Sequence, residues 1–130
     1  MFDLDRFTAE CRAALAEDKG GHRAVREVVA RAVSEPGGVL ADLGEPRRGE
    51  VQKLYHAPDL TILSVIWGPR MTIMPHNHRM WAVIGVYTGC EDNIFGAAWI
   101  ATAAARSRRR ERRRCAPGTA SCLARTSSTR

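Results

Sequence analysis

Two histidines separated by one residue, His76 and His78, are the side chains of this sequence best suited to chemistry. In an extended backbone, side chains two positions apart lie on the same side, so both imidazoles would face one point while Asn77 faces away. Each neutral imidazole supplies one ring nitrogen without adding charge, which suits a divalent metal such as iron, zinc, nickel or manganese. The spacing therefore predicts a metal site with His76 and His78 as ligands, against the alternative of two ordinary surface or core histidines.

Strand-like segments flank the two histidines. Four segments alternate in polarity or are rich in β-branched and aromatic residues, namely residues 51–56, 60–67, 81–87 and 91–95. Turn residues separate them, at Ala57-Pro58-Asp59, Gly68-Pro69-Arg70 and Thr88-Gly89. Residues 71–75 are expected to be a short extended segment that delivers the histidines, stiffened by Pro75. Short antiparallel strands at this spacing favour a sandwich or a small barrel.

The N-terminal third is expected to be helical. Apolar residues recur at three- and four-residue steps over residues 3–18 and again over residues 22–34, which predicts two amphipathic helices packed outside the barrel. Cys11 occupies an apolar position of the first helix, so we expect a small buried hydrophobe rather than a nucleophile. Pro36-Gly37-Gly38 is expected to end the second helix, and residues 42–50 are expected to form a loop.

Charge is distributed unevenly along the 130 residues. Residues 1–95 hold 11 Lys and Arg against 13 Asp and Glu, a net of −2, whereas residues 96–130 hold 9 Arg and one Glu, a net of +8. No apolar run approaches the roughly 20 residues of a membrane helix, and the acidic N-terminus is unlike a signal peptide. We therefore expect a cytoplasmic protein without a membrane role, and contact with nucleic acid only through the basic tail.

Residues 68–95 resemble the first metal motif of the cupins, which have a double-stranded β-helix fold. The resemblance is carried by Gly68, by Pro75-His76-Asn77-His78 and by Gly89, which closes the following hairpin. The familiar motif has a glutamate a few residues beyond the second histidine, whereas this sequence has Trp81, Ala82 and Val83 there. That departure resembles the cysteine dioxygenase-like branch, and residues 60–95 are similar to bacterial proteins described as predicted metal-dependent enzymes of that branch.

The resemblance implies a metal, a substrate and a ligand set. Members of the branch use three histidines and non-haem iron(II) to add dioxygen to a small thiol, so Fe(II) is the expected cofactor, with zinc, nickel and manganese as other metals that suit the donors. The expected partners are dioxygen and a small thiol or carboxylate substrate. Candidates for the third ligand are Glu91, Asp92 and His56, each of which also suits a solvated surface role. Arg79 suits a clamp on a substrate carboxylate or an outward salt bridge.

Residues 96–130 break the cupin pattern. A second motif with the third histidine is expected some tens of residues after Phe95, but no histidine follows His78. The segment is instead rich in Ala, Arg, Ser and Thr, which is typical of disorder. One hypothesis is a single-base frameshift near Phe95. The other frame turns Trp99-Ile100 into an aspartate codon and permits G-E-D-I-I-H-S over residues 124–130, a strand followed by a histidine.

The expected fold class is mainly β, an incomplete cupin with two N-terminal α-helices and a disordered basic C-terminal tail. Its expected parts are a helical region over residues 1–50, a partial cupin β-domain over residues 51–95, and an Arg/Ala-rich tail over residues 96–130 outside the fold. The expected function is a metal-dependent, cysteine dioxygenase-like oxidoreductase that loses activity if a shifted frame removes the third ligand. The alternative is a non-catalytic cupin domain that binds a metal or a small ligand.

Overall fold

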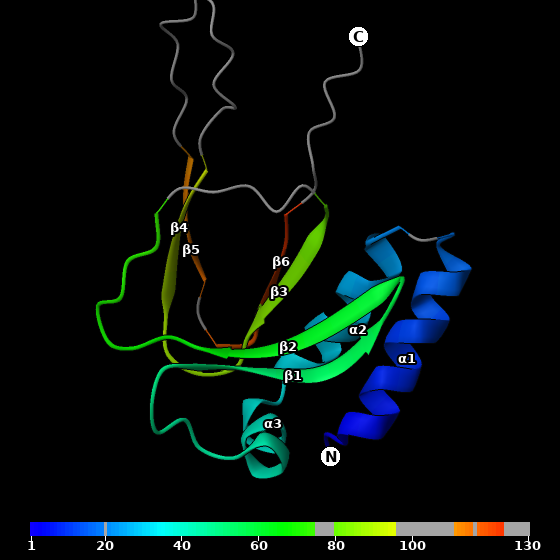
Figure 1. The fold of residues 1–130 in the computed structure, drawn as a ribbon, viewed down its shortest axis with the longest axis horizontal. Coiled ribbons are helices and arrows are strands. Elements are labelled where there is room, and N and C mark those ends of the chain that lie inside the picture. The colour runs from blue at the N-terminus through cyan, green and yellow to red at the C-terminus, as the bar shows by residue number, and fades with distance from the viewer. Residues whose placement is uncertain (20, 75–79, 96–110, 116, 124–130) are drawn as a thin grey trace, which may run out of the picture.

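The fold combines three helices with three two-stranded antiparallel sheets (Figure 1). A computed structural model describes residues 1–19, 21–74, 80–95, 111–115 and 117–123. The elements are α1 (Leu4–Glu17), α2 (Arg23–Val33), α3 (Pro36–Leu43), β1 (Glu50–Ala57), β2 (Leu60–Ile66), β3 (Ala82–Val86), β4 (Glu91–Phe95), β5 (Glu111–Cys115) and β6 (Thr119–Leu123). Within these described residues, no helix combines the length and the apolar character needed to cross a membrane.

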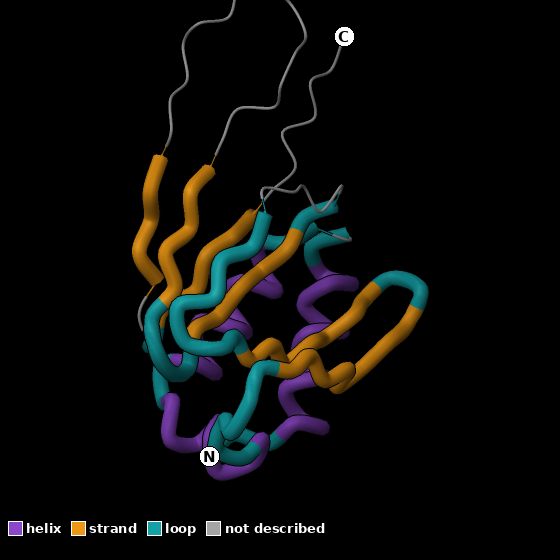
Figure 2. The backbone as a smooth tube through the Cα atoms, turned by 60° about the vertical axis from the view of Figure 1, so that its left-hand side comes forward, coloured by secondary structure: helices purple, strands orange, loops and turns teal. Residues whose placement is uncertain are grey.

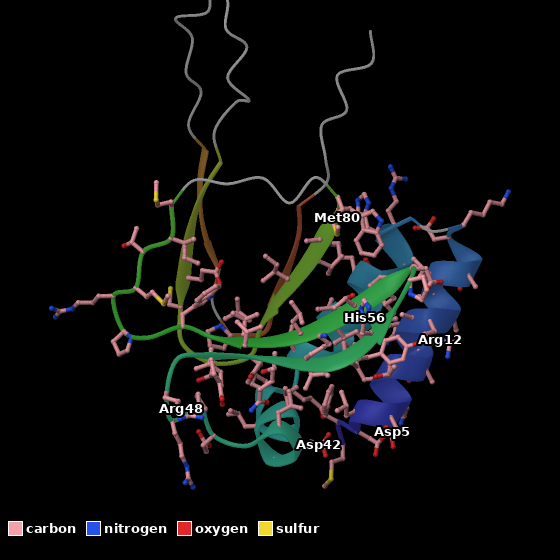
Figure 3. The ribbon with its side chains drawn as sticks, in the orientation of Figure 1. Asp5, Arg12, Asp42, Arg48, His56 and Met80 are labelled. Carbon is pink, nitrogen blue, oxygen red and sulfur yellow. The ribbon has the colours of Figure 1, made fainter. Side chains whose placement is uncertain are left out.

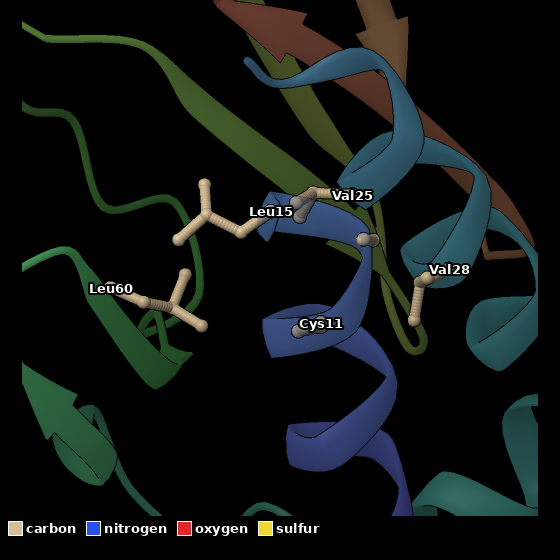
Figure 4. Close-up of a cluster of buried hydrophobic side chains, with 6 residues drawn as sticks. Cys11, Leu15, Val25, Val28 and Leu60 are labelled. Carbon is tan, nitrogen blue, oxygen red and sulfur yellow. The ribbon is translucent and has the colours of Figure 1, made fainter. Parts of the chain in front are cut away.

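The two predicted N-terminal helices are confirmed as α1 and α2. The Asp3 carboxylate caps α1 by accepting a hydrogen bond of 2.7 Å from the backbone N–H of Arg6. The apolar stripes of the two helices meet in the main core, which Leu60 of β2 completes (Figure 4). The buried members of this core are Cys11, Ala14, Leu15, Val25, Val28 and Leu60. The periodicity of the N-terminal third therefore reflects a real packing face.

A third helix, α3, occupies a segment that the sequence analysis divided between a helix stop and a loop. The second helix does end before Pro36, at Val33, and residues 44–49 lie outside helices and strands, but the helix between them was not predicted. Pro36 is the first residue of α3, where its missing N–H and fixed φ suit a helix start. The helix ends at Leu43 and is capped by Gly44, which has a φ of 86°. Asp42 of α3 accepts a hydrogen bond of 3.0 Å from the backbone N–H of Leu4, so α3 is tied to the start of α1.

The predicted hairpin of β1 and β2 is confirmed, with Pro58 and Asp59 between the paired residues Ala57 and Leu60. Side chains alternate between the two faces of this sheet. One face is buried and carries Leu60, Ile62 and Ser64 of β2, and the other is exposed and carries Thr61 and Leu63. We call these the inward and the outward face of the β1–β2 sheet. Leu60 and Ile62 of the inward face pack in the main core with side chains of the helices, and Figure 2 shows the backbone of this sheet beside the helices.

Strands β3 and β4, predicted from the apolar pattern, find their partners in the basic tail. β3 pairs with β6 from Ala82 opposite Leu123 to Val86 opposite Thr119. β4 pairs with β5, with Asp92 opposite Arg114. For residues 111–115 and 119–123, this corrects the expectation that the segment 96–130 lies outside the fold. Local composition did not indicate these strands, because their hydrogen bonds come from long-range pairing rather than from β-forming side chains.

The architecture is accordingly mixed rather than mainly β, since the helices and the strands hold similar numbers of residues. Each described sheet has two strands, and the strand orders are β1-β2, β3-β6 and β4-β5. The closed barrel that the cupin resemblance implies therefore remains a proposal. Among the described residues, the strands that precede and follow residues 75–79 in the sequence are β2 and β3.

Candidate metal centre

The predicted ligands His76 and His78, together with Arg79, fall in residues 75–79, outside the described residues. Their chelate geometry stays a prediction, and the structure describes the chain on either side of them. Met74 precedes the motif and is 83% exposed, and Met80 follows it and is 67% exposed. Figure 3 labels Met80. Exposed apolar side chains thus precede and follow the motif in the sequence, and single side chains of this kind are ordinary on protein surfaces.

A tight turn leads from β2 toward the motif. The backbone N–H of Met71 donates a hydrogen bond of 3.1 Å to the carbonyl of Gly68, and Arg70 has a φ of 60°. This confirms the turn predicted at Gly68-Pro69-Arg70. The next residues, Met71 to Met74, belong to no strand and are exposed. In the segment before the predicted motif, the described restraint is therefore the hydrogen-bonded turn at Gly68, and residues 71–74 pair with no strand.

The chain after the motif is anchored on the helices. Trp81 is half-buried against the main core, and its ring lies 6.1 Å from the ring of His22 at the start of α2. β3 then crosses α2 at Gly85, where an added Cβ would lie 2.6 Å from a methyl carbon of Val29 and 2.7 Å from one of Val33. Only glycine allows this approach without a shift of the helix. The chain that follows the predicted motif is therefore anchored by the packing of Trp81 and β3 against the helices.

The candidate third ligands do not gather around a common point in the described part of the chain. His56 is exposed on the outward face of the β1–β2 sheet (Figure 3), and its Nδ1 lies 2.9 Å from the Thr61 hydroxyl. Glu91 begins β4 and is half-buried, and Asp92 lies opposite Arg114 in the β4–β5 register. No group of three or more His, Cys, Asp or Glu side chains suited to a metal occurs among the described residues.

A buried polar pair that the sequence analysis missed joins the two strands around the motif. The hydroxyl oxygens of Ser64, on β2, and Tyr87, directly after β3, lie 3.1 Å apart. Ser64 is only 4% exposed, and it interrupts an otherwise apolar inward face. The sequence did contain a signal for this pair. Alternation along β2 assigns Ser64 to the core side, and a buried hydroxyl needs a hydrogen-bond partner.

Two other groups of chemical interest belong to the helices. Glu10 accepts a hydrogen bond of 2.9 Å from Arg6 and lies 3.6 Å from Arg31, and the Arg6 hydrogen bond is the main cause that lowers the pKa of Glu10. Burial, followed by the charge of Glu10, raises the pKa of the Cys11 thiol to about 11. Cys11 therefore stays protonated and unreactive at neutral pH, as expected from its place in the apolar stripe.

In comparisons with known proteins, no family model, no curated protein and no solved structure matches the chain.

Proposed function

We propose that this chain is a cupin-type metal-binding protein and that its activity is that of a non-haem iron(II) dioxygenase acting on a small thiol. The observation that carries the proposal is the His-x-His spacing of His76 and His78 in the connection between β2 and β3. The short antiparallel strands before and after this connection support it. Fe(II) is the metal we propose, and zinc, nickel and manganese are its competitors for two imidazole donors.

The donors present suit a divalent metal but fall one short of the set that dioxygen chemistry needs. An iron(II) site of this kind takes three protein ligands on one side and leaves the opposite positions for substrate and dioxygen. His76 and His78 supply two ligands, no histidine follows them in the sequence, and the described residues hold no acidic or imidazole cluster to supply the third. We therefore propose metal binding by the two histidines, with turnover limited by the third donor.

Arg79 is the residue we propose for substrate recognition. Its guanidinium directly follows the second histidine in the sequence, and its planar set of donors matches a carboxylate in a two-point contact. The substrate class is then a small thiol that also carries a carboxylate. Replacing Arg79 with Lys tests this, because a lysine retains the charge but loses the two-point contact. We expect weaker substrate binding with unchanged metal binding.

The experiment that tests the metal site is an anaerobic Fe(II) titration of the purified chain beside the His76→Ala, His78→Ala double variant. We expect binding of one equivalent by the parent chain and its loss in the double variant. Equal binding by both proteins would contradict the assignment of the two histidines. Thiol-dependent oxygen consumption with added Fe(II) then tests turnover, with the double variant as the control for oxidation by free iron.

A second candidate function is a domain that binds a metal or a small ligand without turnover. The absence of a third histidine after His78 favours it, because two ligands hold a metal more weakly and leave too many positions to solvent. The same two measurements separate the candidates. Stoichiometric Fe(II) binding without thiol-dependent oxygen consumption would select the non-catalytic function.

The frameshift hypothesis also has a direct test. Adding one base near the Phe95 codon restores the frame that permits a strand and a histidine in the last seven positions. If this histidine is the missing ligand, the restored chain will bind Fe(II) at least tenfold more tightly, since each further protein ligand adds to metal affinity. Equal affinity in the two chains would show that the altered segment supplies no ligand.

A further inference from the structure

A pocket with a volume of about 210 Å³ lies between the start of α1 and the end of α2. Its lining residues all fall within residues 1–10 and 28–35. The N label of Figure 1 marks this end of α1. The pocket is therefore built without the strands that flank the predicted metal motif, and its chemistry does not depend on the proposed function.

One part of the pocket lining is apolar and aromatic. Val28 of α2 is buried, and the half-buried Phe2, Phe7 and Ala32 complete this part. The ring centroids of Phe2 and Phe7 lie 5.3 Å apart with the planes tilted by 45°, a favourable arrangement for aromatic rings. An apolar cavity of about 150 Å³ takes up benzene, so this pocket has room for one aromatic ring with a small substituent.

The other part of the lining holds three linked charges. Glu10 accepts a hydrogen bond of 2.9 Å from the Nε of Arg6, and the guanidinium of Arg31 lies 3.6 Å from the second oxygen of Glu10. The Arg6 and Arg31 side chains are exposed, so a ligand in the pocket can reach both guanidiniums. Two positive groups share one carboxylate, and the three side chains together carry one net positive charge.

The charged side chains of the lining favour an anion over a cation. A guanidinium carries several N–H donors, and one carboxylate cannot accept from two complete sets of them. The acidic groups are more fully used, because Glu10 serves both arginines and Asp3 caps α1 by accepting from the backbone N–H of Arg6. Glu35 is the lining carboxylate that opposes an anion, and it is exposed to solvent, which screens its charge.

We propose that this pocket binds a small aromatic carboxylate, with the ring against Phe2, Phe7 and Val28 and the carboxylate on the guanidinium of Arg31. Arg31 is assigned to the ligand because its contact with Glu10 is the longer of the two, so less is lost when a ligand replaces it. Its planar set of donors suits a two-point contact with a carboxylate. Glu10 then competes with the ligand, since both are carboxylates directed at the same guanidiniums.

The probe for this site is benzoate, and benzamide and benzylamine are its neutral and cationic analogues of similar size. Binding to the full chain, without added metal, is followed by NMR from the methyl signals of Val28 and Ala32, which line the pocket. For a ligand of this size we expect a benzoate dissociation constant on the order of 1 mM.

Three single variants separate the charges of the pocket from charge in general. Arg31→Gln removes the proposed carboxylate contact, and Glu10→Gln removes the competing carboxylate. Arg26→Gln is the matched control, because Arg26 is an exposed arginine of the same helix that pairs with Glu27 and does not line the pocket.

Arg31→Gln should weaken benzoate binding by about two- to fivefold, the range that an exposed ion pair supports, and should leave benzamide binding unchanged. Glu10→Gln should strengthen benzoate binding by a similar factor, a gain that partial unfolding cannot imitate. Arg26→Gln should change neither affinity by more than the error of the measurement.

Three results would overturn the proposal. Benzamide or benzylamine binding as tightly as benzoate would refute the carboxylate as the recognised group. Equal benzoate affinity in Arg31→Gln and Arg26→Gln would refute the role of Arg31. If the Val28 and Ala32 signals showed no saturable shift well above the expected dissociation constant, the pocket would not be a binding site for this class of ligand.

Discussion

His56 of β1 and Thr61 of β2 are paired residues on the same face of the β1–β2 sheet, and the imidazole Nδ1 of His56 lies 2.9 Å from the Thr61 hydroxyl oxygen. Both residues lie on the outward face, whereas Ser64, which ties β2 to the chain after β3, lies on the inward face. The outward face is the side away from that tie. His56 therefore lies on the opposite face of β1–β2 from the contact with Tyr87, the residue after β3.

We therefore predict that His56→Ala leaves Fe(II) stoichiometry unchanged and affinity within about twofold, since an exposed side chain contributes little beyond its own contacts. His76→Ala, measured in the same anaerobic titration, is the positive control for loss of binding. A loss in His56→Ala as large as that in His76→Ala would instead identify His56 as the third ligand.

The two described cysteine thiols should differ sharply in reactivity. Cys11 is 2% exposed with a pKa raised to about 11, whereas Cys90 is exposed. A thiol-specific reagent at pH 8 should modify Cys90 in the native protein and reach Cys11 only on unfolding, because the thiolate is the reactive form. Peptide mapping locates the modified residues, and Cys90→Ser removes the fast adduct. Modification of Cys11 in the native protein at the same rate would contradict its burial.

The free energy of unfolding should decrease at alkaline pH because of the Cys11 thiol. The native state holds the Cys11 proton up to a pKa of about 11, above the ordinary value of 9.0 expected in the unfolded chain. Between these values the native state binds more protons than the unfolded state, so the free energy of unfolding decreases as the pH rises from 9 toward 11. Urea unfolding across this range measures the slope. Cys11→Ala should flatten it, and an unchanged slope would assign it to other groups.

Any side chain at Gly85 should destabilise the fold. A Cβ there would lie 2.6 Å from a methyl carbon of Val29, and that contact joins β3 to α2. Gly85→Ala is expected to lower the free energy of unfolding by about 1–3 kcal/mol, the usual cost of overpacking. Gly68→Ala is the control, because no atom lies within 4 Å of the corresponding Cβ. Similar urea midpoints for the two variants would refute the close packing of β3 on α2.

Asp18 is predicted to stabilise α2 from outside it. Its carboxylate accepts hydrogen bonds from the backbone N–H groups of Arg23, at 3.0 Å, and Ala24, at 3.4 Å. The N-cap residue itself, His22, makes no such side-chain bond. Asp18→Ala should therefore cost about 1 kcal/mol in thermal or urea unfolding, as loss of an ordinary cap does. Asp18→Asn keeps an oxygen acceptor and should lose less, and equal losses would point to the charge alone.

Much of the fold was predictable because its signals are local. Periodic apolar residues gave α1 and α2, and alternation with turn residues gave β1, β2, β3 and β4. α3 escaped prediction because its support is tertiary. An added Cβ at Gly38 would lie 3.2 Å from the backbone nitrogen of Phe2, and Asp42 binds the backbone N–H of Leu4. Such contacts with the start of α1 are invisible to a window of sequence.

The candidate metal site remains a prediction, because His76 and His78 lie outside the described residues. The contact between Ser64 and Tyr87 could not be predicted, because it joins residues far apart in sequence. β5 shows the same limit. It places Arg112, Arg113 and Arg114 in a strand because β4 supplies the hydrogen-bonding partner, not because arginine favours strands.

The pairing of Ala82 with Leu123 sets an order of events during synthesis. The six buried side chains of the main core and both strands of the β1–β2 hairpin are present once β2 has left the ribosome, whereas β3 stays unpaired until β6 emerges. Non-local pairing of this kind slows folding and leaves a strand edge open in the nascent chain. That open edge of β3 is where a chaperone would bind and where aggregation would begin.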